Sequence, residues 1–333
     1  MKKIVSLLVQ YAVFLGLGLF LIWWSVRSLS DADMRSLRES LGGANYRLVL
    51  PAMGMLMLSH YSRALRWRIM MEPLGFQPSR SNTFIAVLLG YFFNLLVPRM
   101  GEVMKCTTLA RYERTPVDRL IGTMVAERAL DVLCLLTVFG LAFLSQMDLV
   151  GDVLGGELGK LGGGMSNPSR AGSIGVLAVV FAGVAVLGYF LVRRFRHVGV
   201  IARVLALAEG VWQGLTSIRL IRRRTEFLLH TVFIWFMYLL SIRVGFYAME
   251  PVSHLGMGPS LTILSTGSLA MIVTQGGIGA YQIAVQKSLA LYGIPAVGGL
   301  AFGWLLWAFQ TVLMLVAGVI CLIVLPILNR DKS

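Results

Sequence analysis

Cysteine and histidine are scarce in this sequence, and their scarcity limits the chemistry that we expect. Only 3 cysteines and 4 histidines occur among 333 residues. Cys106, Cys134 and Cys321 lie far apart in apolar surroundings, without the spacing of a metal site or of a disulfide framework. We therefore predict that they are small buried hydrophobic residues, and that the protein uses no metal or other cofactor.

Catalytic signatures are missing as well. The sequence contains no nucleophile elbow and no carboxylate pair placed for hydrolysis. The glycine-rich turn at residues 276–279 has neither the lysine of a phosphate-binding loop nor a strand before it. No soluble stretch is long enough for a nucleic-acid-binding domain. We therefore expect a protein that is not an enzyme and does not bind nucleic acid.

Apolar residues, by contrast, make up 57% of the chain, and its mean hydropathy is +0.76. Several apolar runs reach or exceed the roughly 18 residues that mark a transmembrane helix. The first run, Ile4–Trp24, is longer than the apolar region of a signal peptide, and no A-x-A-like site follows it. The sequence therefore predicts an all-α polytopic membrane protein with an uncleaved first span.

Two apolar segments are too short to cross a membrane, and each ends in a break. Residues Thr83–Val97 stop at Pro98, and residues Ser260–Thr274 stop at Gln275 before three glycines. A spanning helix needs about 20 apolar residues. Short interrupted segments at matching places in two halves of a membrane protein are typical of a transporter's binding site.

The basic residues decide how these two segments are placed. The chain has 30 Lys and Arg against 16 Asp and Glu, and the arginines concentrate beside spans. If both short segments crossed fully, Arg99–Arg119 and Arg193–Arg224 would lie outside, against the positive-inside rule. We therefore predict two re-entrant hairpins in a cell inner membrane, with both termini cytoplasmic. The six full spans are Ile4–Ser25, Leu48–Met71, Val117–Gln146, Ser173–Val192, Glu226–Ala248 and Gly298–Leu325.

This topology implies an inverted internal repeat. Met71-Glu72-Pro73 and Met249-Glu250-Pro251 stand at equivalent points, after the second span of each half. Three full spans per half place the second copy upside down. The predicted parts are a first repeat at 1–147 with a hairpin at 83–112, an outer glycine-rich loop at 148–172, a second repeat at 173–326 with a hairpin at 260–292, and a tail at 327–333.

The first break offers positive charge at membrane depth. A helix that restarts at Gly101 directs its positive end towards the break, and Arg99 and Lys105 add charge there. Together they form a candidate site for a phosphate headgroup. The alternative is that Arg99 and Lys105 extend to the cytoplasmic interface.

Glu127, Arg128 and Asp131 lie inside the third full span, where ionisable groups are costly and normally functional. Glu127 and Asp131 share one helix face, with Arg128 as the local partner and Arg99 or Lys105 as others. They predict either headgroup binding or a proton-coupled role. A purely structural charge network is the alternative.

The second break places glycines where backbone N–H groups can form an anion-binding nest, or where they serve only close packing. Arg243, deep in the fifth span, is predicted to contact substrate or an acid. The predicted substrate-binding residues are therefore Asn94, Arg99, Gly101, Glu102, Lys105, Glu127, Arg128, Asp131, Arg243, Thr274, Gln275, Gly276, Gly277, Gly279 and Gln282.

Four motifs together resemble a known family over nearly the whole chain. They are Asn94–Glu102 with Lys105, Glu127-Arg128 with Asp131, Gly276–Gly279, and Trp307 with Gln310. This combination resembles the flippase-like family named after the lysylphosphatidylglycerol synthase transmembrane region. In bifunctional members, this region is thought to move a lipid between leaflets while a separate soluble domain aminoacylates it. The resemblance implies a stand-alone, transporter-like protein.

Two residues depart from the family pattern. Lys105 stands where the family usually has Arg, which keeps the charge but loses the bidentate fork. Gln282 stands where many members have Glu, which removes a titrating carboxylate from the second hairpin.

We therefore expect a flippase that moves an anionic or phosphate-bearing lipid between leaflets, with membrane lipids as its partners. Two alternatives remain open. The protein is an accessory subunit of, or itself, an intramembrane lipid-modifying enzyme, or it is a small-solute secondary transporter.

Overall fold

The computed structural model describes residues 15–25, 27, 29–97, 100–146 and 221–330. Over these residues the chain forms helices joined by turns, with no strand, as the sequence predicts. The whole predicted outer loop and the whole predicted fourth span lie outside the described residues, as do Pro98 and Arg99.

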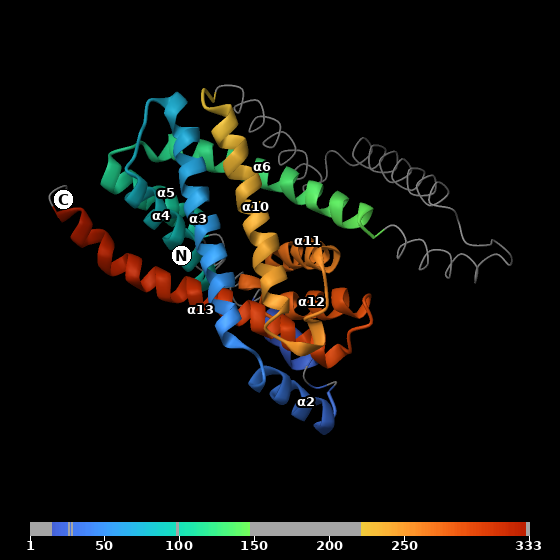
Figure 1. Ribbon diagram of the computed structural model, residues 1–333. Helices are drawn as coiled ribbons and strands as arrows, with labels where there is room; N and C mark the ends of the chain where they lie inside the picture. The colour runs from blue at the N-terminus through green and yellow to red at the C-terminus, as the bar shows by residue number, and fades with distance from the viewer. Residues whose placement is uncertain (1–14, 26, 28, 98–99, 147–220, 331–333) are drawn as a thin grey trace, which may run out of the picture.

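The described helices follow the expected order, and residues 15–25 are helical before them (Figure 1). The α-helices are α2 (Asp31–Gly42), α3 (Val49–Met71), α4 (Arg80–Leu96), α5 (Met100–Glu113), α6 (Val117–Leu144), α10 (Arg224–Phe246), α11 (Met257–Val273), α12 (Ala280–Ala290) and α13 (Ala296–Leu328). Four short 3-10 helices accompany them: η1 (Tyr46–Leu48), η2 (Glu72–Leu74), η3 (Glu250–Val252) and η4 (Gln275–Gly277).

The same series of helix lengths occurs twice along the chain. Helices α3 and α10 each have 23 residues, and each is followed by a 3-10 helix that contains a proline. A 17-residue helix comes next in both cases, α4 and then α11. A break, a shorter helix and a long helix follow. The long helices are α6 with 28 residues and α13 with 33.

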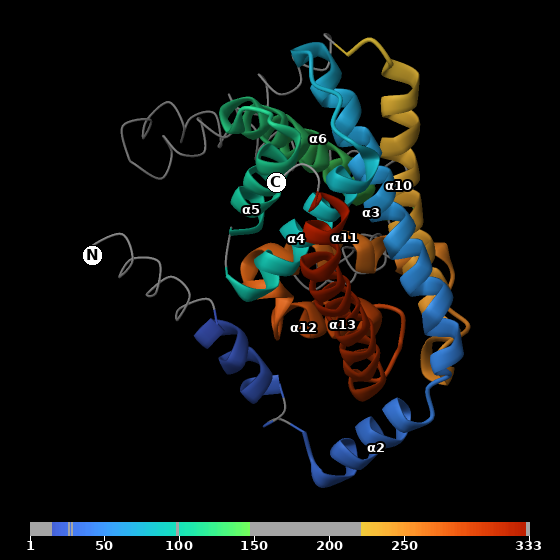
Figure 2. The ribbon, with the colours of Figure 1, turned by 90° about the vertical axis from the view of Figure 1, so that its left-hand side faces the viewer.

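Helices α3 and α10 lie side by side and run in opposite directions (Figures 1 and 2). Arg223, just before α10, donates to Glu72, just after α3, over 3.0 Å. At the other end, the N–H of Asn45 donates to the carbonyl oxygen of Ala248 over 2.7 Å. Helices α3 and α10 are therefore held together at both of their ends.

Each interrupted helix folds back as a hairpin that returns to its own start. In the first hairpin, Asn82 at the start of α4 donates to Glu113 at the end of α5 over 2.6 Å. In the second, the hydroxyl groups of Thr262 and Tyr292 lie 2.8 Å apart. In each hairpin, the start of the first helix therefore lies beside the end of the second, and the break between the two helices forms the tip.

The two tips contact each other. Gln275 Nε2 donates to the carbonyl oxygens of Asn94 and Leu95, over 2.5 and 3.3 Å. The indole of Trp307 on α13 donates to the carbonyl oxygen of Gly276 over 2.8 Å. Gly276 has φ 57°, in the left-handed region that glycine tolerates. Segments 180 residues apart in sequence therefore meet at one point.

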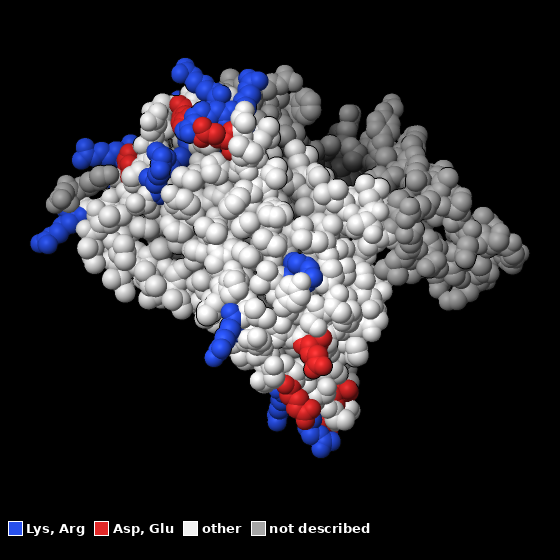
Figure 3. Space-filling model, in the orientation of Figure 1, with Lys and Arg blue, Asp and Glu red and all other residues white. Residues whose placement is uncertain are grey.

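Two described helices, α10 and α13, are long and apolar enough to cross a membrane, and Leu15–Ser25 and α11 are shorter apolar helices. Helices α3 and α6 are long but carry charged residues. On the face in Figure 3, charged side chains gather over α2 and over the opposite end, and few lie between. A sparsely charged zone between charged ends is typical of a membrane protein.

The tight packing of the first hairpin gives a testable expectation. A Cβ on Gly101 would lie 1.9 Å from the carbonyl oxygen of Gly90, so Gly101→Ala must push α4 and α5 apart. Overpacking of this kind costs about 1–3 kcal/mol. We expect a lower melting temperature in detergent. Gly140→Ala, with no atom within 4 Å of the added Cβ, is the matched control, and equal melting temperatures would contradict the tight packing.

Candidate functional site

A cluster of charged side chains lies buried where α3, α5 and α6 meet. Arg63 and Arg66 come from α3, Lys105 from α5, and Glu127 and Asp131 from α6. The side chains of Arg66 and Glu127 are 0% and 1% exposed, and Asp131 is the most open of the five at 15%. Charges that are removed from water need partners, so the pairing in this cluster decides its stability.

Glu127 is bound by cations from two different helices. Arg63 Nη1 donates to its Oε1 over 2.9 Å, and Lys105 Nζ donates to its Oε2 over 2.6 Å. Arg66 Nη2 lies 3.5 Å from Oε1. Both oxygens of this buried carboxylate are therefore neutralised, and α3 and α5 are joined through it.

Asp131 binds the same two arginines. Arg63 Nη1 lies 2.5 Å from Asp131 Oδ2, and Arg66 Nη2 lies 2.8 Å from Oδ1. Three cations thus face two carboxylates, which leaves one excess positive charge in the cluster. The Nε atoms of Arg63 and Arg66 have no hydrogen-bond partner among the described residues.

Lys105 is held by an aromatic ring as well as by Glu127. Its Nζ lies 4.0 Å from the centroid of Trp67, within the range of a cation–π interaction. The Trp67 indole donates to Thr123 on α6 over 2.9 Å. The ring therefore ties α3, α5 and α6 together beneath the charges.

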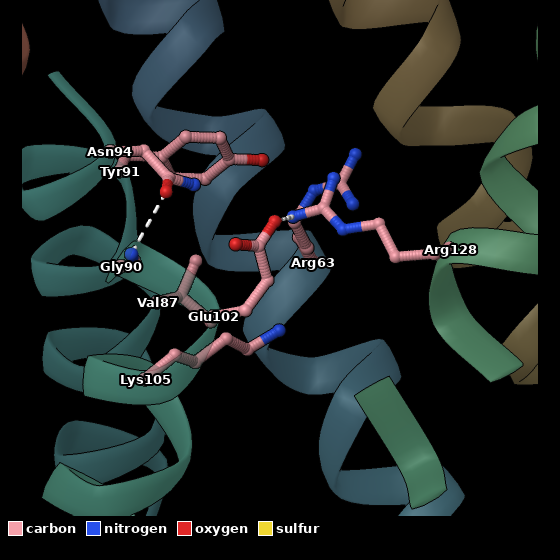
Figure 4. A pocket seen from close by; sticks show the side chains of 9 residues that line it. Arg63, Val87, Gly90, Tyr91, Asn94, Glu102, Lys105 and Arg128 are labelled. Atoms are coloured by element: carbon pink, nitrogen blue, oxygen red, sulfur yellow. Dashed lines mark hydrogen bonds and ion pairs between the residues drawn. The ribbon is translucent and has the colours of Figure 1, made fainter. Parts of the chain in front are cut away.

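A small pocket adjoins the cluster (Figure 4). It offers about 10 Å³, room for about one water molecule. Asn94 Oδ1 accepts from the backbone N–H of Gly101 over 2.8 Å, so the restart of the helix is capped by the protein itself. The lining residues are Arg63, Val87, Gly90, Tyr91, Asn94, Gly101, Glu102, Lys105 and Arg128.

The structure therefore brings together many of the predicted site residues, but it assigns Arg128 a different partner. Arg128 Nη2 lies 3.7 Å from Glu102, and the Arg128 side chain is 47% exposed. The prediction that Arg128 pairs with the acids of its own helix is wrong. Adjacent residues on a helix point in different directions, so Arg128 and Glu127 do not face each other. Lys105 is confirmed as a partner of Glu127.

Sequence reasoning missed Arg63 and Arg66, which hold both carboxylates. They lie three residues apart inside the predicted span Leu48–Met71. Ionisable residues inside a span were the signal that singled out Glu127 and Asp131, and it applies equally to these arginines.

None of the residues of the second break lines this pocket, although Gln275 bonds to the backbone of Asn94, which does. A Cβ on Gly277 would meet Met271 Sδ at 2.6 Å, and one on Gly279 would meet the carbonyl oxygen of Gly18 at 2.6 Å. These two glycines therefore permit close packing. Thr274 and Gln282 are buried, and their side-chain polar atoms have no partner among the described residues.

Arg243 is likewise separate from the cluster. Its Nη2 donates to the hydroxyl group of Tyr247 over 2.6 Å, and its guanidinium lies 4.3 Å from the centroid of that ring. The expected acidic partner is therefore wrong for the described part of the chain, because the partner is a tyrosine one helical turn away. Cys106 and Cys321 are buried and Cys134 is partly buried, and all three are free thiols.

Comparisons with known proteins agree with the motifs of the sequence. A family model described as the lysylphosphatidylglycerol synthase TM region matches residues 7–318. A UPF0104 membrane protein of Methanocaldococcus jannaschii is 35% identical over 69 residues, which are 20% of this chain and 20% of that protein. The match therefore spans a fifth of that relative's length. No solved structure matches the chain.

The cluster predicts a sharp difference between two arginines. Arg63→Ala removes a cation from both carboxylates, and breaking a buried pair costs about 3–5 kcal/mol, so we expect little folded protein. Arg128→Ala loses only a partly exposed pair, worth up to about 1 kcal/mol, and should fold. Thermal unfolding of the two purified variants measures this. Equal losses would contradict the pairing described.

Proposed function

The chain belongs to the family of the lysylphosphatidylglycerol synthase TM region, and from this premise we propose that it is a lipid transporter of the cell inner membrane. It binds the head of an anionic or phosphate-bearing lipid beside the buried cluster and moves that head between leaflets. The acyl tails stay in the bilayer.

The observation that carries this proposal is the excess positive charge of the cluster. Arg63, Arg66 and Lys105 outnumber Glu127 and Asp131 by one, in a nearly water-free setting. A buried cation without a counter-charge is costly, so an anionic ligand would stabilise the site. Arg and Lys form strong charge-assisted hydrogen bonds with phosphate.

The state described here is closed. A phosphate group needs more room than the single water position that the pocket offers. Glu102 and Arg128, 26% and 47% exposed, are the most open charged pair of its lining. Separation of this pair would enlarge the pocket and free Arg128 for the headgroup. We therefore assign the Glu102–Arg128 pair to the entrance.

The proposed topology has six full spans and two re-entrant hairpins in two inverted repeats. Two contacts support it. The ends of the first hairpin lie with the C-terminal end of α13, since Asn82 bonds to Asn329 over 2.8 Å. The ends of the second hairpin lie with the C-terminal end of α6, since Gln146 donates to Thr262. The hairpins thus open towards opposite ends of the molecule while their tips meet.

The charges of α3 and α6 are compatible with spanning. Both helices carry ionisable residues that would be costly in lipid, but Arg63, Arg66, Glu127 and Asp131 neutralise one another inside the protein. Buried pairing of this kind is the usual arrangement for ionisable groups within a membrane. The charge content of α3 and α6 therefore does not argue against two further spans.

This topology is tested by labelling of single cysteines. In a chain whose own three cysteines are replaced by alanine, His254→Cys should react with an impermeant thiol reagent in intact cells. Asp118→Cys should react only after lysis, because the positive-inside rule places that end in the cytoplasm. Both positions are exposed. Labelling of Asp118→Cys from outside would contradict the proposed orientation.

Transport is tested in liposomes that contain a fluorescent anionic phospholipid. The purified protein should speed exchange between leaflets, and Arg128→Gln should slow it by about tenfold or more, since a hydrogen bond to a charged group is worth about 1.5–3 kcal/mol. Arg47→Gln is the matched control, because Arg47 lies in η1, outside the cluster and its pocket. It should exchange lipid at the wild-type rate.

Equal exchange in protein-containing and empty liposomes, across several phosphate-bearing lipids and with an imposed proton gradient, would refute the transporter proposal. The best-supported function would then be that of an accessory subunit of a lipid-modifying enzyme.

A further inference from the structure

A second, larger cavity lies on the other side of Tyr91 from the charge cluster. Its volume is about 140 Å³, and α3, α4, α10, α11, α12 and α13 all contribute to its wall. Both hairpins take part, the first through Tyr91 and the second through Ser268 and Tyr281. None of the predicted substrate-binding residues lines it.

This cavity adjoins the basic pocket directly. Tyr91 lines both spaces. His60 of the cavity and Arg63 of the pocket are three residues apart on α3, about one helical turn. The rings of His60 and Tyr91 have centroids 4.3 Å apart and form the partition. The two spaces are therefore adjacent but separated by this aromatic pair, and a ligand whose two polar parts are linked would reach both when the pair moves aside.

The polar groups of the cavity wall are hydrogen-bonding side chains without full charges. No Asp, Glu, Lys or Arg belongs to the wall as described. His60 is 3% exposed, and its Nδ1 has no hydrogen-bond partner among the described residues. The polar members of the wall are His60, Tyr91, Tyr238, Ser241, Ser268, Tyr281 and Gln310.

The rest of the wall is aliphatic, with residues such as Ile263, Leu264 and Met271. A mostly apolar cavity with a few polar groups is typical of a small-molecule site. Its volume is close to that of a 150 Å³ cavity that binds benzene, so a six-membered ring is the right size. Hydroxyl groups on such a ring would meet the polar side chains, and its C–H faces would meet the apolar ones. A cationic group is disfavoured, because Arg63 lies one turn away.

We propose that this cavity binds an uncharged, hydroxyl-bearing group, a sugar-like ring or a short polyol, that is linked to the phosphate held at the basic pocket. The inference rests on the proposed function and specifies the part of the substrate beyond its phosphate. His60, Ser268 and Gln310 would select that part, while the charge cluster selects the phosphate.

The test compares two lipids with the same acyl chains, phosphatidylinositol and phosphatidic acid, by their dissociation constants for the full-length protein in nanodiscs. Phosphatidylinositol carries a hydroxylated ring on its phosphate, whereas phosphatidic acid carries none and has the more negative phosphate, so charge alone would favour phosphatidic acid. We expect the wild-type protein nevertheless to prefer phosphatidylinositol roughly tenfold, because several hydrogen bonds to the ring, each contributing modestly, add up.

Three variants and one control locate this preference. His60→Phe keeps a ring but removes the unpartnered nitrogen, Gln310→Leu keeps size but removes the amide, and Ser268→Phe fills the cavity. Each should reduce the preference to about one. Leu269→Phe, on the outer face of the same helix with Leu269 46% exposed, should keep it. Because there are three different variants, the preference can still be measured in the other two if one of them misfolds.

The outcomes separate this inference from the proposed function. If neither lipid binds, both are overturned. If both lipids bind equally well to the wild type, the transporter proposal stands and the cavity proposal is overturned, as it is if the preference survives in all folded cavity variants. Soluble inositol phosphate, which carries the same ring and phosphate without acyl chains, distinguishes the sources of the group. Binding as tight as that of phosphatidylinositol would assign the two spaces to a free solute, and much weaker binding would assign them to a lipid.

Discussion

The centre of this protein depends on the burial of one carboxylate. Glu127 is 1% exposed, and a buried carboxylate without counter-charges would cost several kcal/mol. Its two oxygens are satisfied by Arg63 of α3 and Lys105 of α5, so three helices must meet at a single point. The same pairing allows α3 and α6 to hold ionisable residues in a chain that is otherwise strongly apolar. The side chains that hold the three helices together are therefore also the ones that carry the excess positive charge.

The interrupted helix is what places Lys105 within reach. In a continuous helix, Lys105 would lie nearly 40 Å from Arg80, at 1.5 Å per residue. The break before Met100 turns the chain back instead, until Glu113 bonds to Asn82. Close contact of Gly90 with Gly101 lets the two arms lie against each other. The second hairpin then contacts the first through Gln275, so a movement of either tip would affect the other.

Much of this could be predicted from sequence, but not all of it. The short apolar segments marked both hairpins, because a break in a helix depends on local residues such as the glycines at 276–279. Glu127 and Asp131 were found from their depth in a span, and Lys105 from its place after the break. Arg128 was assigned the wrong partner, because nearness in sequence is not nearness in space on a helix. The cavity beside Tyr91 was not predicted, since residues of six helices build its wall and Gln310 alone among them belongs to a motif of the sequence.

The sequence by itself determined the class of the protein and its family, because hydropathy, charge and motifs need no knowledge of folding. It also determined where the two helices break. Only the tertiary structure decided which charges neutralise one another, and it left one cation in excess. Arg63 and Glu127 are 64 residues apart, and no local pattern states that α3 and α6 are neighbours. Pairing between helices follows from how their surfaces pack, which is a property of the whole chain.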